Sequence, residues 1–148
     1  MGSVNHSSSY DKDFYAWAIE NAELLRQKKF EAIDVDNIAE EIESMGKGNK
    51  RSLFSHLSVL MAHLLKWKFQ PTRRSKSWSL TIKNQRFELS DLLNESPSLK
   101  KEITVQFDHA YQKALIVAAQ ETFMDEKEFP ETCPFTLDQC LDNDFFPD

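Results

Sequence analysis

The sequence predicts an all-α fold, a single-domain bundle of four to five helices with a C-terminal tail, rich in proline and phenylalanine, packed on it. Apolar residues recur three and four positions apart along most of the chain, as on one face of a helix, and no stretch shows the alternation typical of a strand. A length of 148 residues is enough for one hydrophobic core. We therefore expect residues 10–148 to form the domain and the Ser-rich residues 1–9 to be a disordered lead-in.

The first helix is expected over residues 11–29, with Asp11 as its N-cap. Its apolar positions keep helical spacing, and basic residues gather in its last turn, where they suit the helix dipole. A second helix is expected to begin at Asp34 or Asp36, since aspartate is a preferred N-cap residue.

Gly46 and Gly48 leave two interpretations of the next segment open. Glycine commonly ends a helix, which favours a separate helix over residues 51–69. The apolar register nevertheless continues across the two glycines, which favours one long helix over residues 36–69.

Proline and serine mark the later boundaries. Pro71 should stop the helix before it, because proline lacks a backbone donor and disfavours helical geometry in the preceding residue. Ser75 or Ser77 should cap the next helix. Ser96, followed by proline, should cap the last long one, which is expected to end near residue 122. In the tail, Thr136 and the glutamine three residues later have the spacing of a capping box.

The charges are unevenly distributed. The net charge is -6, yet the window 44–87 holds ten of the 18 basic residues and no acidic residue. The rest of the chain therefore holds eight basic residues against all 24 acidic ones. Such segregation indicates either an anion-binding face or two parts that neutralise each other on folding.

Several kinds of site are not indicated by the residue spacings. His56 and His63 lie seven positions apart, or about 10.5 Å along a helix, which is too far to share a metal ion. Cys133 and Cys140 form neither a disulfide framework nor a zinc set. Three glycines leave no phosphate-binding loop. We expect no metal and no cofactor, and, without a signal peptide or a spanning segment, a cytoplasmic location and no membrane contact.

The candidate site is the stretch 66–86, which we call the basic corner. Its guanidinium groups precede a helix N-terminus, where free backbone N–H groups favour anions. Our candidate ligand-binding residues are Lys66, Trp67, Arg73, Arg74, Ser77, Trp78, Gln85 and Arg86, with His63, Glu40 and Glu41 beside them. The favoured interpretation is structural, with the arginines paired to Glu40, Glu41 or Glu43. An anion site is the alternative, and both can exist at one cleft.

Five sequence blocks resemble a known family. They are YDKDFYAWAIENAELLR, IAEEIESMG, HLLKWKFQPTRRSKSWSLTIKNQR, ESPSL and FPETCPFTLDQCLDNDFFP. In this order, from Tyr10 to Pro147, they resemble domain of unknown function family 29, whose members are bacterial and abundant in cyanobacteria. The resemblance implies a single all-helical cytoplasmic domain and brings no activity. The GKGNK stretch departs from the pattern and bears on whether the helix is continuous there.

Three functions compete. We favour a non-catalytic binding or interaction module whose basic corner recognises an acidic protein partner or an anionic ligand. Nucleic acid is disfavoured because the pI is 5.2. The first alternative is a small enzyme acting on a phosphorylated or anionic substrate, with the arginines as a clamp and Glu40, Glu41 or His63 as a base. The second is a purely structural domain, which could form a homodimer through the phenylalanines of the tail.

Overall fold

The computed structural model of the chain describes residues 6–148, in which six α-helices and two 3-10 turns are found and no strand. The helices are α1 (His6–Lys12), α2 (Phe14–Arg26), α3 (Val35–Phe69), α4 (Lys76–Glu95), α5 (Leu99–Glu121) and α6 (Leu137–Leu141); the turns are η1 (Pro71–Arg73) and η2 (Glu126–Glu128). The all-α prediction is confirmed. The chain divides into two compact units, with the boundary between Lys47 and Gly48, and each is described by itself.

The N-terminal helix was predicted incorrectly. Two helices, α1 and α2, replace the expected helix 11–29, because the backbone breaks at Asp13. Asp13, not Asp11, is the N-cap of α2, and its Oδ1 accepts a hydrogen bond of 3.0 Å from the backbone N–H of Ala16. Of the expected lead-in, residues 6–9 belong to α1, and residues 1–5 lie outside the described part.

A buried polar network organises the first unit. The indole Nε1 of Trp17 donates to Asp34 Oδ2 at 2.8 Å, and the backbone N–H of Asp34 donates to Asn21 Oδ1 at 2.8 Å. Asn21 Nδ2 in turn donates to the Trp17 carbonyl at 2.9 Å. Asp34 directly precedes α3, which agrees with the first of the two predicted start positions. Its Oδ2 accepts a hydrogen bond of 2.8 Å from Nδ2 of Asn37. Asn21, a polar residue in the predicted apolar stripe, is thereby satisfied.

The glycines do not interrupt α3. Of the two interpretations left open, the single helix is observed, from Val35 to Phe69. Neither glycine has a positive φ, and a Cβ at either would meet no atom within 4 Å. The helix then ends before Pro71, as predicted.

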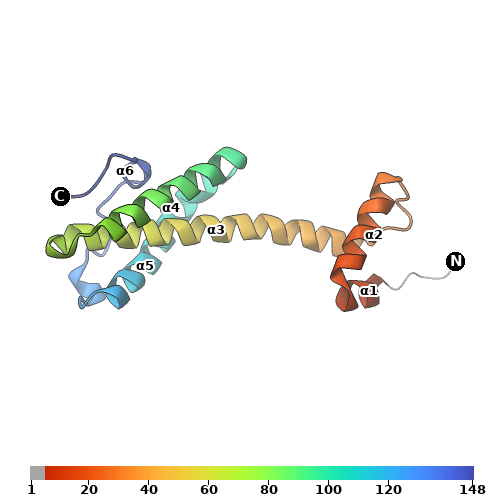
Figure 1. The fold of residues 1–148 in the computed structure, drawn as a ribbon, viewed down its shortest axis with the longest axis horizontal. Helices are drawn as coiled ribbons and strands as arrows, with labels where there is room; N and C mark the ends of the chain where they lie inside the picture. The colour runs from red at the N-terminus through yellow and green to blue at the C-terminus, as the bar shows by residue number, and fades with distance from the viewer. Residues whose placement is uncertain (1–5) are drawn as a thin grey trace. The chain divides into compact units, whose positions relative to one another are not determined.

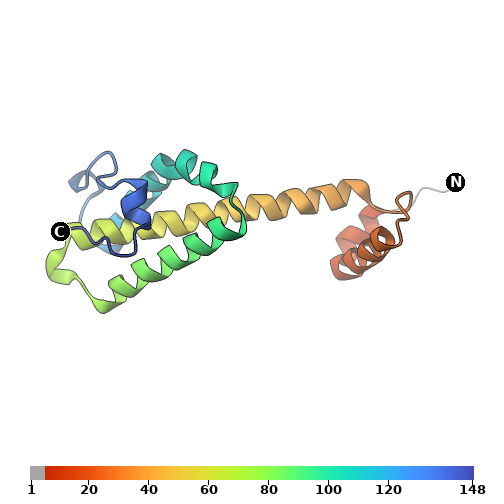
Figure 2. The ribbon, with the colours of Figure 1, turned by 90° about the horizontal axis from the view of Figure 1, so that it is seen from above.

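The second unit is built around the C-terminal half of α3. Figures 1 and 2 show α4 and α5 on either side of it, with α6 lying against α4. Its core contains residues from all three long helices and from the tail, among them Leu57, Leu64, Ile82, Leu89 and Tyr111. No helix in residues 6–148 is both long and apolar enough to cross a membrane.

The caps of the second unit are mostly those predicted. Ser75 caps α4, accepting from the Trp78 N–H at 3.2 Å, and Thr136 forms the capping box of α6. Ser96 was predicted incorrectly as the cap of α5: it is the last, C-cap residue of α4, and α5 begins at Leu99.

The tail packs on its own unit, as predicted. Phe129 and Phe135 are buried, and Phe145 and Phe146 lie half-buried against the core. The phenylalanines proposed for a dimer contact are therefore largely used inside the unit.

Candidate functional site

Arg86 is the most constrained residue of the basic corner. It lies in α4, and only 3% of it is exposed. Its Nε donates to the carbonyl of Cys140 at 2.7 Å, and its Nη2 donates to the carbonyls of Gln139 and Phe145 at 3.3 and 2.8 Å. One guanidinium group thus binds three backbone carbonyls of α6 and the segment that follows it.

Arg74 binds the end of the tail in the same way. Its Nε donates to the Trp67 carbonyl at 2.7 Å, its Nη2 donates to the Pro147 carbonyl at 3.2 Å, and its guanidinium carbon lies 5.1 Å from the centre of the Trp67 ring. Arg73, in contrast, is exposed and lies over the exposed ring of Phe123 at 5.4 Å.

Arg74 and Arg86 are held by backbone carbonyls of their own unit and not by Glu40, Glu41 or Glu43, so the expected arginine–glutamate pairing is corrected for these two arginines. Glu41 accepts a hydrogen bond from the hydroxyl of Tyr10 within the first unit. Glu40 is exposed on α3 in that unit.

Lys66, by contrast, has a carboxylate partner. Its side chain is almost fully buried, and its Nζ lies 2.7 Å from Glu121 Oε2 and 4.7 Å from the centre of the Trp78 ring. Sequence reasoning missed Glu121, since it lies 55 positions away at the end of α5 and no local pattern links it to Lys66. Ser77, at the start of α4, is exposed.

His56 and the candidate residue His63 have different hydrogen-bond partners. His56 Nδ1 lies 2.6 Å from Oε1 of Gln85, and His63 Nδ1 donates to the Val59 carbonyl at 2.9 Å. Burial lowers the pKa of His63, and the nearby Lys66 ammonium lowers it further, while the bond to Val59 and the Glu121 carboxylate oppose these effects. Within residues 6–148 no group of three His, Cys, Asp or Glu side chains is placed to hold a metal ion.

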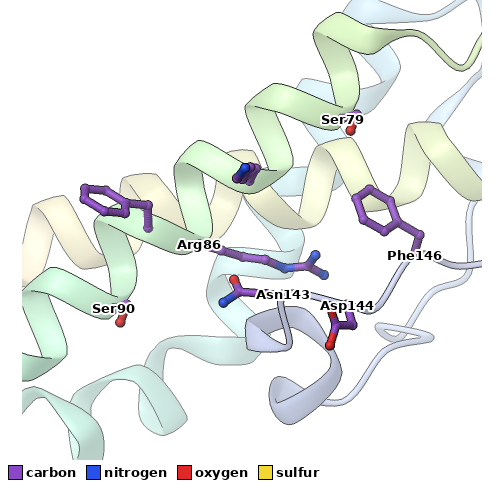
Figure 3. Close-up of a pocket in the computed structure, with 8 residues that line it drawn as sticks. Ser79, Arg86, Ser90, Asn143, Asp144 and Phe146 are labelled. Carbon is purple, nitrogen blue, oxygen red and sulfur yellow. The ribbon is translucent and has the colours of Figure 1, made fainter.

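A hollow of about 490 Å³ lies between α4 and the tail (Figure 3). We call it the tail hollow. It is lined by Ser79, Lys83, Arg86, Phe87 and Ser90 of α4 and by Asn143, Asp144 and Phe146 of the tail. Ser79, Lys83, Arg86 and Ser90 lie three or four positions apart and so share one helix face, and Phe87 adjoins them. Of our predicted site residues, only Arg86 lines it. Helical spacing from Arg86 could have found Lys83 and the serines, but nothing in the sequence places the tail beside them.

Arg86, which lines this hollow, has one polar atom without a partner. Its Nη1 is buried and has no hydrogen-bond partner among the described residues. Figure 3 shows the guanidinium between the side chains of Phe146 and Asp144, and its carbon lies 5.5 Å from the centre of the Phe146 ring. Burial lowers the pKa of Arg86, while the Asp142 and Asp144 carboxylates raise it. A guanidinium group is not deprotonated in proteins, so Arg86 remains a cation.

The two cysteines stabilise the same region. The neighbouring Cys140 thiol lowers the pKa of Cys133, and the Cys133 thiol together with burial raises the pKa of Cys140. Cys140 is fully buried in the core, and its carbonyl accepts from Arg86. Both cysteines therefore pack the tail against α4.

Replacing Arg86 should reveal its structural role. We expect Arg86→Met to lower the free energy of unfolding by about 3 kcal/mol, because three carbonyls lose a charged donor. The matched control, Arg73→Met, removes only an exposed contact with an aromatic ring and should cost less than about 1 kcal/mol. Urea denaturation followed by circular dichroism measures both, and equal losses would contradict the assignment.

His63 should make the protein sensitive to mild acid. Its pKa in the folded state is lowered below the ordinary value of about 6.5. As pH falls through 6.5 the unfolded chain therefore takes up a proton that the folded chain does not, and stability declines. Urea midpoints at pH 7.5 and pH 5.5 should differ more for the natural protein than for His63→Asn, whose amide can still donate to the Val59 carbonyl. An unchanged difference would assign the pH dependence to other groups.

Comparison with known proteins places the chain in a family. Residues 9–146 match the family described as domain of unknown function DUF29. No curated protein and no solved structure matches the chain. The matched range includes every residue that lines the tail hollow. The chain therefore belongs to the DUF29 domain family.

Proposed function

We propose that this protein is a non-catalytic binding module that takes an anionic group in the tail hollow. The observation that carries the proposal is Arg86, a buried cation that lines the hollow and has one nitrogen without a hydrogen-bond partner. A buried donor without a partner is costly, so an acceptor that reaches Nη1 gains a strong, charge-assisted hydrogen bond.

Neighbouring groups support an anion in particular. Lys83 lies about one turn before Arg86 on the same face of α4 and is exposed, so its ammonium supplies a second positive charge. The hydroxyls of Ser79 and Ser90 and the amide of Asn143 add neutral donors around the hollow.

A ligand in the hollow reaches Nη1 only when a neighbouring side chain shifts, and we expect Phe146 to be that side chain. Its ring lies beside the Arg86 guanidinium, and Nη1 is buried. The same ring lies 5.0 Å from the ring of Trp67. Because indole emission responds to the surrounding side chains, binding should alter the fluorescence of Trp67.

The geometry favours binding over catalysis. His63, proposed as a base, does not line the tail hollow, and Glu40 and Glu41 belong to the first unit. Among the residues that line the hollow, Asp144 supplies the one carboxylate. The cytoplasmic location, the cyanobacterial source, the acidic protein partner and the homodimer stay predictions.

Anion titration tests the proposal. In a heteronuclear NMR experiment at constant ionic strength, acetate and inorganic phosphate should each shift the signals of residues 143–146 in a saturable way. Lys83→Ala should weaken this binding at least about fivefold, since it removes one of the two positive charges at the hollow.

Lys76→Ala is the matched control for charge. Lys76 is an equally exposed lysine of α4 that does not line the tail hollow, so its loss should leave both affinities unchanged. The proposal fails if neither anion gives saturable shifts at residues 143–146, or if the two lysine variants weaken binding equally.

A further inference from the structure

We infer that the tail hollow is built for an aromatic monocarboxylate, that is, one carboxylate carried on a flat apolar body. This inference rests on the proposed function, because it specifies the ligand of that same site. Three features of the hollow carry it: the balance of its charges, the aromatic side chains in its wall and its size.

The charged side chains around the hollow favour a ligand with a single negative charge. Lys83 and Arg86 bring two positive charges, and the Asp144 carboxylate offsets one of them. A carboxylate can accept from the N–H groups of Nη1 while the ammonium of Lys83 balances its charge. A phosphate brings up to a second negative charge and three acceptor oxygens, which the Asp144 carboxylate would repel. The site therefore favours a carboxylate over a phosphate.

The wall of the hollow contains two aromatic rings. Phe87 adjoins Arg86 in α4 and is 62% exposed, and the half-buried Phe146 lines the hollow from the tail. Exposed aromatic surface gains free energy when it is covered, and rings pack best on other flat groups. A ligand that fills the hollow would cover Phe87 while its carboxylate faces Arg86.

The hollow is larger than a simple anion needs. Its volume of about 490 Å³ lies within the range of about 300–1,000 Å³ that is common for small-molecule sites. An acetate ion has only four heavy atoms and would leave most of this space and the ring of Phe87 in water. The volume therefore favours a ligand with a body attached to its carboxylate.

Three probes distinguish the contribution of the anionic group from that of the apolar body: acetate, phenylacetate and phenyl phosphate. Each is titrated into the full chain, and binding is followed by NMR at residues 143–146. Phenylacetate should bind at least about tenfold more tightly than acetate, as expected for covering one ring. Phenyl phosphate should bind more weakly than phenylacetate. Asp144→Asn should improve the binding of phenyl phosphate more than that of phenylacetate, because it removes the repelling charge.

Two phenylalanine variants test the contact with the body. Phe87→Ser should abolish most of the advantage of phenylacetate over acetate while leaving acetate binding unchanged. Phe123→Ser is the control, since Phe123 is also exposed in the second unit but does not line the hollow. Both side chains are largely in solvent, so neither variant should disturb folding.

The outcomes distinguish the two proposals. If acetate and phosphate bind in a Lys83-dependent way but phenylacetate binds no more tightly than acetate, the inference is overturned and the proposed function stands. The inference is also overturned, and the proposed function kept, if phenyl phosphate binds most tightly of the three probes. If no anion binds at residues 143–146, the proposed function fails and the inference fails with it.

Discussion

The hydrogen bonds from Arg86 to the carbonyls of Gln139, Cys140 and Phe145 connect the tail to the helices of the second unit. A five-residue helix such as α6 leaves most of its carbonyls without partners inside the helix, and burial makes such groups costly. A guanidinium group can satisfy several of them because its donors are arranged in a rigid planar fork, which the single ammonium of a lysine does not provide. Arg86 thus fixes α6 and the segment after it beside α4, together with the bond from Arg74 to Pro147 and the buried phenylalanines of the tail.

The basic residues of the window 44–87 find partners of more than one kind. Arg74 and Arg86 bind carbonyl dipoles, Lys66 binds the carboxylate of Glu121, and Arg73 lies on an aromatic ring. The interpretation in which the basic residues are used on folding therefore holds in part, and the anion-binding face stays a prediction. Some basic residues stabilise the fold, and Lys83 is exposed to solvent beside the hollow, where it can meet a foreign anion.

The fold could be predicted where the signals are local. Pro71, Ser75 and Thr136 determine boundaries through their own backbone or side-chain chemistry, and the structure confirms them. The break at Asp13 was missed because Asp11 and Asp13 are equally good caps and the apolar spacing does not distinguish them. The continuity of α3 could not be decided locally, since the glycines and the apolar register give opposite indications.

The candidate site could be predicted only in its centre. Arg86 was identified from charge and spacing, but its partners are backbone carbonyls, which carry no residue identity that a sequence could reveal. Glu121 and the lining residues of the tail reach the site through tertiary packing from distant parts of the chain. Lys83 could have been chosen from its spacing to Arg86, but charge alone does not distinguish it from the other basic residues of the window.

The most direct test of this account is the rate at which the side-chain Nε–H groups of the arginines exchange with water, measured by NMR on the natural protein. The Nε–H of Arg86 is buried and donates to Cys140, so it should exchange many times more slowly than that of the exposed Arg73. Equal exchange rates for Arg86 and Arg73 would contradict the account, because Arg86 would then not hold the tail on α4.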